Sequence, residues 1–184
     1  MRKIKDFILD LLLAISLDAL ILMGTWIVYT EWFSTEAQNE KIQKMYRQIV
    51  AVTGQTQDAL PLVISEASIE NAYNDGTKIV IYKGLINNTS SWDEVAMILG
   101  HEVAHGMLGH LDESLGDLTP NQIAVLEGNA DKMGAVYMMK AGWDVCKGRQ
   151  LFKHWKEKHG NALGQDHPDY SYRFDELDIN CGDK

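Results

Sequence analysis

The stretch His101-Glu102-Val103-Ala104-His105 lies in the middle of an apolar run and decides how the rest of the chain is interpreted. Apolar positions from Val95 to Leu111 recur at helical spacing, which predicts a largely buried helix. Residues four apart lie on one face of a helix, so both imidazoles can reach one metal ion while the carboxylate of Glu102 faces a water molecule beside it. Such a pentad also arises by chance, so a third ligand from elsewhere in the chain is needed to support a zinc site.

A second helix, predicted over residues 120–141, offers that third ligand, because Glu127 and Asp131 stand one turn apart on it. A catalytic zinc takes three protein ligands and leaves one position for water, and two histidines with one glutamate form a known set. We therefore expect His101, His105 and Glu127 to bind one zinc ion per chain. Asp131 is placed to accept a hydrogen bond from the second ring nitrogen of a ligating histidine. The alternative is that both carboxylates lie on a solvated helix face.

A set of three histidine ligands is disfavoured by the residues that follow the pentad. That pattern requires glycine at position 108 and histidine at position 111, where Leu108 and Leu111 stand. His110 is displaced by one position, which is about 100° around a helix. We expect His110 to point away from the metal and to interact with the end of the helix.

These residues predict hydrolysis of peptide bonds, with Glu102 as the general base that takes a proton from the attacking water. A polypeptide is then the substrate, and the chain is a zinc metalloendopeptidase. Two alternatives remain open. One is a catalytically silent zinc-binding module with a role in quality control or interaction, and the other is hydrolysis of a non-peptide amide.

The composition limits the size and the partners of the protein. The chain has 184 residues, of which 46% are hydrophobic, enough for one well-buried domain and an appendage. The net charge is -9, and the basic residues are scattered outside the first few positions, so nucleic-acid binding is not expected. The sequence does not indicate an oligomeric state.

The first 33 residues are predicted to form a signal anchor in a membrane, and residues 34–184 the catalytic domain. The most apolar part, Leu11 to Tyr29, could cross about 28 Å as a helix. Basic residues precede it, which predicts a cytoplasmic N-terminus and an exported, periplasm-like location for the catalytic domain. Because Asp10 and Asp18 are costly inside a bilayer, interfacial attachment as an amphipathic helix is the alternative.

The two cysteines, Cys146 and Cys181, are not spaced as a thiolate zinc site. They could form a disulfide in an oxidising compartment, which would agree with export, or remain two buried free thiols.

The spacing of apolar residues predicts an α+β fold that is mostly helical, with a small sheet beside the helix of the pentad and a hydrophobic N-terminal helix. Further helices are expected at residues 42–50, 144–159 and 169–178, and short strands at residues 60–64 and 79–82.

Several segments beyond the pentad resemble the membrane-associated gluzincin family of the heat-shock protease HtpX and the CAAX prenyl protease. The resemblance rests on the strand block, on the helix of the third ligand and on a C-terminal His-Pro…Arg element. The matching residues are Asn71-Ala72-Tyr73, Ile79-Val80-Ile81, Gly84-Leu85, the stretch from Glu127 to Gly134, Ala141-Gly142-Trp143-Asp144, His167-Pro168 and Arg173.

The resemblance implies roles for residues that spacing alone does not assign. It implies a zincin-like domain in which an edge strand containing Asn71, Ala72 and Tyr73 pairs with extended substrate. It places His167 near the cleft, where the imidazole could stabilise the oxyanion or simply cap the next helix. It also implies that Arg173 pairs with a buried carboxylate near the site. The stretch from Lys147 to Gln165 matches no family pattern, which leaves the substrate cleft undefined.

Overall fold

The computed structural model describes residues 35–55, 60–112, 118–160 and 169–177, together with Met23 and Cys181. The chain divides into two compact units, residues 1–41 and 42–184, and the second contains the candidate site. The predicted anchor, apart from Met23, and His167 lie outside the described residues. None of the described helices combines the length and the hydrophobicity that a bilayer crossing requires.

The described strands form a small mixed sheet with the order β1-β3-β2. β3 (Ile79–Tyr82) runs parallel to β1 (Leu62–Ser65) and antiparallel to β2 (Ala72–Asn74). β3 is buried at its first three residues, which are all β-branched, as expected of a central strand. The order leaves β2 at an edge of the sheet, which is where the resemblance to the gluzincins placed a substrate-binding strand.

The helix that contains the pentad, α3 (Trp92–Met107), is largely buried, as predicted. It begins after Ser91, whose hydroxyl accepts a hydrogen bond from the backbone N–H of Glu94 at 3.3 Å. The short helix α2 (Lys83–Asn87), which the sequence pattern did not reveal, connects β3 to α3. Residues 35–51 are helical, and from Ile42 onward their apolar side chains belong to the same core as α3 and the sheet.

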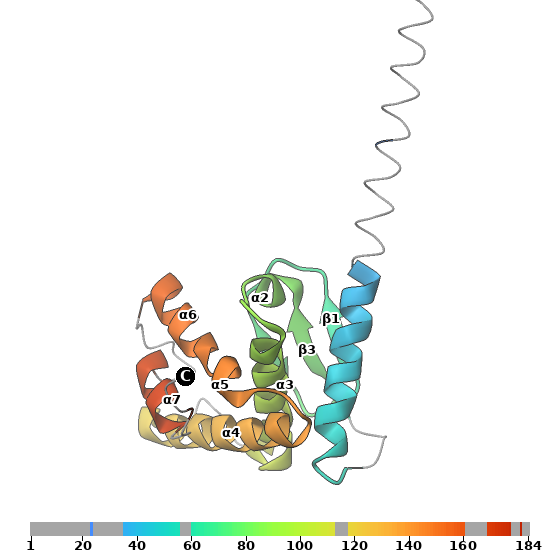
Figure 1. Cartoon of the computed structure of the whole chain (residues 1–184). Coiled ribbons are helices and arrows are strands. Elements are labelled where there is room, and N and C mark those ends of the chain that lie inside the picture. The colour runs from blue at the N-terminus through green and yellow to red at the C-terminus, as the bar shows by residue number, and fades with distance from the viewer. Residues whose placement is uncertain are drawn as a thin grey trace, which may run out of the picture. The chain divides into compact units, whose positions relative to one another are not determined.

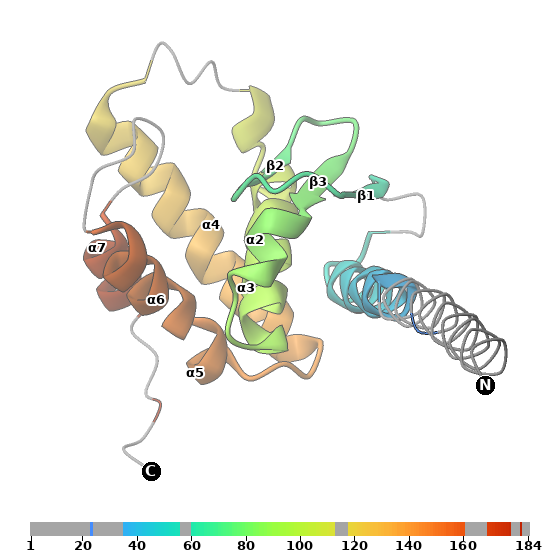
Figure 2. The ribbon, with the colours of Figure 1, turned by 90° about the horizontal axis from the view of Figure 1, so that it is seen from above.

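Within the described residues, four α-helices follow on the other side of α3 from the sheet (Figure 1). They are α4 (Pro120–Lys140), α5 (Val145–Gly148), α6 (Gln150–His159) and α7 (Tyr170–Glu176). α4 begins with proline after a reciprocal capping box between Thr119 and Gln122. Figure 2 shows α4 lying alongside α3, with α6 and α7 farther from the sheet. The arrangement agrees with the predicted class, a mostly helical α+β domain with a small sheet.

The close approach of α3 and α4 depends on two glycines that face each other. A Cβ atom on Gly100 would lie 2.7 Å from the carbonyl oxygen of Gly134, and a Cβ atom on Gly134 would lie 2.6 Å from the backbone nitrogen of His101. Both distances are shorter than real Cβ atoms tolerate. The pair therefore allows the two backbones into contact beside the first histidine of the pentad.

Some predicted boundaries were wrong. α3 ends at Met107 instead of continuing to Leu111, because Gly109 adopts a left-handed φ of 74° and His110 begins a short 3-10 helix, η1 (His110–Asp112). The helix expected over residues 144–159 is divided into α5 and α6.

The two cysteines form a disulfide between α5 and the segment after α7. Of the two states that the sequence left open, the structure contains the bridged one.

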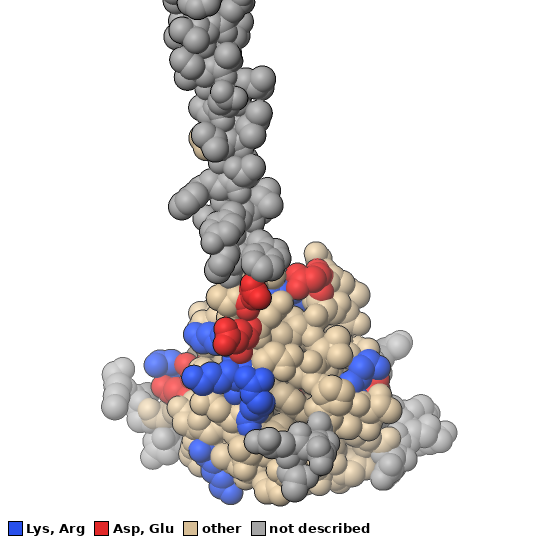
Figure 3. Space-filling model, turned by 90° about the vertical axis from the view of Figure 1, so that its right-hand side faces the viewer, with Lys and Arg blue, Asp and Glu red and all other residues tan. Residues whose placement is uncertain are grey.

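On the face drawn in Figure 3, the described basic side chains lie beside acidic ones instead of forming one continuous basic surface.

Candidate metal centre and cleft

Three side chains from two helices converge on one point. The Nε2 atoms of His101 and His105 lie 3.0 Å apart. The carboxylate of Glu127 approaches them from α4, at 3.5 Å from Nε2 of His101 and 3.1 Å from Nε2 of His105. The structure thus brings together the three predicted ligands, and they form a group of the kind that holds a metal ion.

The distances and the protonation states fit zinc. Ligands about 2.0–2.1 Å from a tetrahedral zinc are separated by about 3.3 Å, close to the separations of the three side chains. Nδ1 of His101 lies 2.8 Å from the carboxylate of Asp131, so Nδ1 carries the proton of the neutral ring and Nε2 presents a lone pair. That lone pair faces the carboxylate of Glu127, and two such acceptors at close range need a proton or a cation between them. Two imidazoles and one carboxylate are a zinc donor set.

The neighbouring carboxylate shifts the pKa of His105. Burial acts to lower the pKa of His105, but the hydrogen bond and the negative charge of Glu127 outweigh it, and the pKa is raised above its ordinary value. The carboxylate therefore favours a positive charge at this point, which a metal ion would supply.

A buried ion pair supports His101 from behind. Asp131 is fully buried, and Arg173 from α7 donates to its carboxylate from Nε at 2.7 Å and from Nη2 at 2.6 Å. Burial acts to raise the pKa of Asp131, but the charge and hydrogen bonds of Arg173 outweigh it and keep the pKa below its ordinary value. Asp131 therefore remains an anion and accepts the proton of His101. A pairing of Arg173 with a buried carboxylate is what the family resemblance implied.

His110 does not join the three converging ligands, but it contacts one of them. Its Nδ1 lies 3.1 Å from Nδ1 of His105, and the residue is buried. The prediction that His110 would point away from this centre was therefore incomplete, because it assumed that the helix continued past Gly109.

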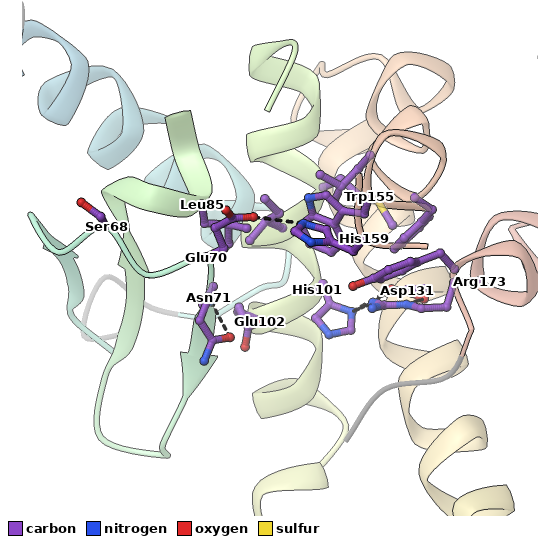
Figure 4. Close-up of a pocket in the computed structure, with 16 residues that line it drawn as sticks. Ser68, Glu70, Asn71, Leu85, His101, Glu102, Asp131, Trp155, His159 and Arg173 are labelled. Carbon is purple, nitrogen blue, oxygen red and sulfur yellow. Dashed lines mark hydrogen bonds and ion pairs between the residues drawn. The ribbon is translucent and has the colours of Figure 1, made fainter. Parts of the chain in front are cut away.

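Glu102 lies beside a cavity of about 550 Å³ that is also lined by His101. The cavity lies between the sheet and the helices α6 and α7, and α3 forms its floor (Figure 4). Asn71 and Ala72 line it from the sheet, and Asp131 and Arg173 line it near the metal centre. Apolar side chains form most of the remaining wall: Leu85, Met97, Ile98, Leu151, Phe152 and Trp155.

The stretch that sequence comparison left unassigned supplies one wall of this cavity. Leu151, Phe152 and Trp155 come from α6, and their spacing places them on one face of that helix. Periodicity could have identified an apolar face here, but not what the face lines.

Contacts of Glu70 join two sides of the cavity. Glu70 lies 3.1 Å from Nε2 of His159 and 2.8 Å from Nζ of Lys158, so the loop before β2 is joined to the end of α6. Figure 4 shows the contact between Glu70 and His159.

The three residues expected in the substrate strand differ in position. Asn71 and Ala72 line the cavity, whereas the ring of Tyr73 packs near that of Tyr82 with centroids 6.3 Å apart. The backbone carbonyl of Asn71 accepts a hydrogen bond from Tyr82 of β3. Because pairing alternates along an antiparallel ladder, the backbone groups of Ala72 face the open side of β2.

Comparison with known proteins agrees with this arrangement. The sequence pattern of peptidase family M48 matches residues 36–126, which include the sheet and α3. Together with the site, this match supports an M48 metallopeptidase. The mitochondrial metalloendopeptidase OMA1 of Arabidopsis thaliana is 26% identical over 130 residues, covering 56% of this chain and 27% of the relative. The M48 match ends at residue 126, within α4, so Glu127 and Asp131 lie beyond it.

Proposed function

We propose that this protein is a zinc-dependent metalloendopeptidase in which His101, His105 and Glu127 hold the metal and Glu102 is the general base. The observation that carries the proposal is the convergence of three side chains that could hold a metal ion, one of which, His101, lines a cavity together with Glu102. The similarity to M48 peptidases and to a metalloendopeptidase supports the same reaction class.

Zinc, when bound, would acidify a water molecule and polarise the substrate carbonyl. Glu102 would accept the proton of the attacking water and then donate it to the leaving amine. The apolar walls would exclude bulk water, which strengthens the electrostatic interactions within the cavity. Asp131 and Arg173 would keep the ring of His101 oriented, as the hydrogen bonds of Asp131 favour.

We propose that substrate binds as an extended polypeptide along β2. The carbonyl of Ala72 faces outward at the edge of the sheet. The outward N–H of Ala72 donates to the side chain of Asn71 at 2.9 Å, so an added strand would have to displace this side chain to pair with both groups. An added strand would lie beside the Glu70–His159 contact, so a long substrate must pass or open this contact.

Three finer assignments rest on sequence and on the resemblance to the HtpX and CAAX protease group. We propose a membrane tether through residues 1–33, a catalytic domain on the exported side, and a role in protein quality control or processing. His167 stays a proposed oxyanion-stabilising residue.

Replacing Glu102 by Gln tests the assignment of the base. The variant should keep its fold and one zinc per chain but lose about 10²–10⁴-fold in kcat on casein or a fluorogenic peptide. Glu66 is exposed and lies after β1, so Glu66→Gln is the matched control and should be fully active. Activity of the native chain should disappear with a chelator and return with zinc.

Two outcomes would contradict the proposal. Unchanged activity in Glu102→Gln would eliminate this residue as the base. A zinc-loaded native chain that cleaves no member of a diverse peptide library would favour the catalytically silent module.

A further inference from the structure

His110 has a position that the zinc ligands and the proposed base do not explain. It follows Gly109, whose left-handed φ of 74° ends the helical path of α3 and turns the chain back. The ring is buried, and its plane is inclined by 74° to that of His105 with the ring centroids 5.0 Å apart. The two Nδ1 atoms lie 3.1 Å apart, which is hydrogen-bond distance.

The other ring nitrogen of His105, Nε2, determines which of the two residues donates this hydrogen bond. Nε2 of His105 faces Glu127 and His101, and it can bind a cation only through its lone pair. The neutral ring then carries its proton on Nδ1, which donates to His110. His110 must accept through Nδ1 and carry its own proton on Nε2.

We propose that His110 is a positioning residue that fixes the tautomer and orientation of His105 as a metal ligand. This inference rests on the proposed metal centre but not on peptide cleavage. A ligating histidine needs an acceptor for its other ring nitrogen, and Asp131 is that acceptor for His101. His110 is the corresponding acceptor for His105. The two partners differ, because one is a buried carboxylate paired with Arg173 and the other is an imidazole.

The surroundings of His110 agree with a neutral acceptor. The ring of His110 is buried, and a positive charge on a buried ring is costly. A neutral imidazole accepts one hydrogen bond and adds no negative charge, so it orients His105 without strongly increasing the ligand's basicity.

Two substitutions at position 110 separate an acceptor from a space-filling ring. In His110→Asn the side-chain oxygen stands the same number of bonds from Cα as Nδ1 does and can accept the proton of His105. In His110→Phe a ring of similar size offers no acceptor. We expect the Phe variant to bind zinc about 10-fold more weakly in competition with a chromophoric chelator, and the Asn variant to recover most of that loss.

The cobalt-substituted proteins provide a spectroscopic readout that does not require activity. The visible absorption of bound cobalt should change in the Phe variant and resemble that of the native chain in the Asn variant. Native zinc affinity in the Phe variant, or equal losses in both variants, would overturn the proposal.

Nitrogen-15 spectra of the native zinc-loaded chain test the tautomers without any substitution. We expect a protonated Nδ1 in His105 and an unprotonated Nδ1 in His110. A protonated Nδ1 in His110 would overturn the proposal even if a variant failed to fold. A chain that binds zinc and cleaves no peptide would contradict the proposed peptidase function and leave these results interpretable.

Discussion

The two sides of α3 support the candidate site by different means. On the helical side, Glu127, Asp131 and Arg173 are buried charged residues from α4 and α7, and they contact one another or the first histidine. On the sheet side, β2 lies at an edge, and one amide hydrogen bond, from Asn74 to the carbonyl of Glu102 at 2.9 Å, ties it to α3. The helical side therefore orients the first histidine through buried charges, whereas the sheet side contacts the pentad through an amide hydrogen bond.

The largest expected effect is on the helical side, in Asp131→Asn. The substitution keeps the shape of the side chain but removes the anion that the buried guanidinium of Arg173 contacts at 2.6 Å, which leaves Glu127 at 3.8 Å. We expect the metal-free protein to lose about 3–5 kcal/mol of unfolding free energy in urea and zinc affinity to fall by about 10–100-fold. Asp175 is exposed on the same helix as Arg173, so Asp175→Asn is the matched control and should change neither quantity.

The same ion pair gives the stability of the metal-free protein a defined pH dependence. The pKa of Asp131 is lower in the folded protein than in the unfolded chain. The ionised Asp131 therefore makes its full contribution to the free energy of unfolding above the ordinary aspartate pKa of about 3.9. The contribution is lost as the pH falls through the folded pKa. Acid titration of unfolding should show this loss in the native chain, and a similar loss in Asp131→Asn would contradict the assignment.

The disulfide tests how far the helical side depends on a covalent link. Cys181 follows α7, which contains Arg173, and the bridge ties this segment to α5. Reduction should lower the unfolding free energy by about 3–4 kcal/mol in the chain-entropy model for a loop of 35 residues. The measurement is urea unfolding with and without reductant, monitored with a thiol assay.

A double variant, with serine at both cysteine positions, is the control for reduction. It should have the stability of the reduced chain and should not respond to reductant. Release of two thiols without any shift of the native unfolding midpoint would show that the bridge does not support the helical side.

The comparison of the two sides also explains what could be predicted from the sequence. Helical spacing predicted that His101 and His105 share one face, because that rule acts within one helix. Glu127, which lies on another helix, was chosen because zinc chemistry requires a third ligand. Asp131, one turn from Glu127, was assigned a role because a ligating histidine needs an acceptor. The pairing of Asp131 with Arg173 joins residues 42 positions apart, and only the family resemblance pointed to it.

The missed features depend on backbone turns and on packing between distant segments. The contact of His110 with His105 depends on the left-handed turn at Gly109, and an uninterrupted helix would have placed the ring elsewhere. The apolar wall formed by α6 became a cavity wall only because that helix faces the sheet across α3. Neither relation is contained in the spacing of residues along one helix.

A smaller effect is expected at the contact between α3 and α4. In Gly134→Ala, the new methyl group would lie 2.6 Å from the backbone nitrogen of His101, so the helices must move apart. We expect a loss of about 1–3 kcal/mol in unfolding free energy and a weaker zinc site, because Glu127 moves with α4. In Gly128→Ala, the methyl group would meet no atom within 4 Å, and this control should be as stable as the native chain or more stable. Equal effects of the two substitutions would show that the close helix contact does not set the ligand geometry.

The smallest effect is expected on the sheet side, at Asn74. Its amide donates to the carbonyl of Glu102, and its oxygen accepts from the backbone N–H of Gly76 at 3.0 Å. Asn74→Asp keeps the second contact and loses the first, whereas Asn74→Ala loses both. We expect each variant to lose about 1 kcal/mol of stability per lost hydrogen bond and to keep its zinc affinity.

The kinetic effect of Asn74→Asp should be a higher KM with a smaller change in kcat, because β2 is no longer held against α3 at the level of Glu102. Asn87 is exposed at the end of α2, and Asn87→Ala is the control for loss of an amide. A fall in zinc affinity in Asn74→Asp comparable to that in Asp131→Asn would remove the distinction between the two sides. An unchanged KM would show instead that substrate does not depend on the position of the β2 edge.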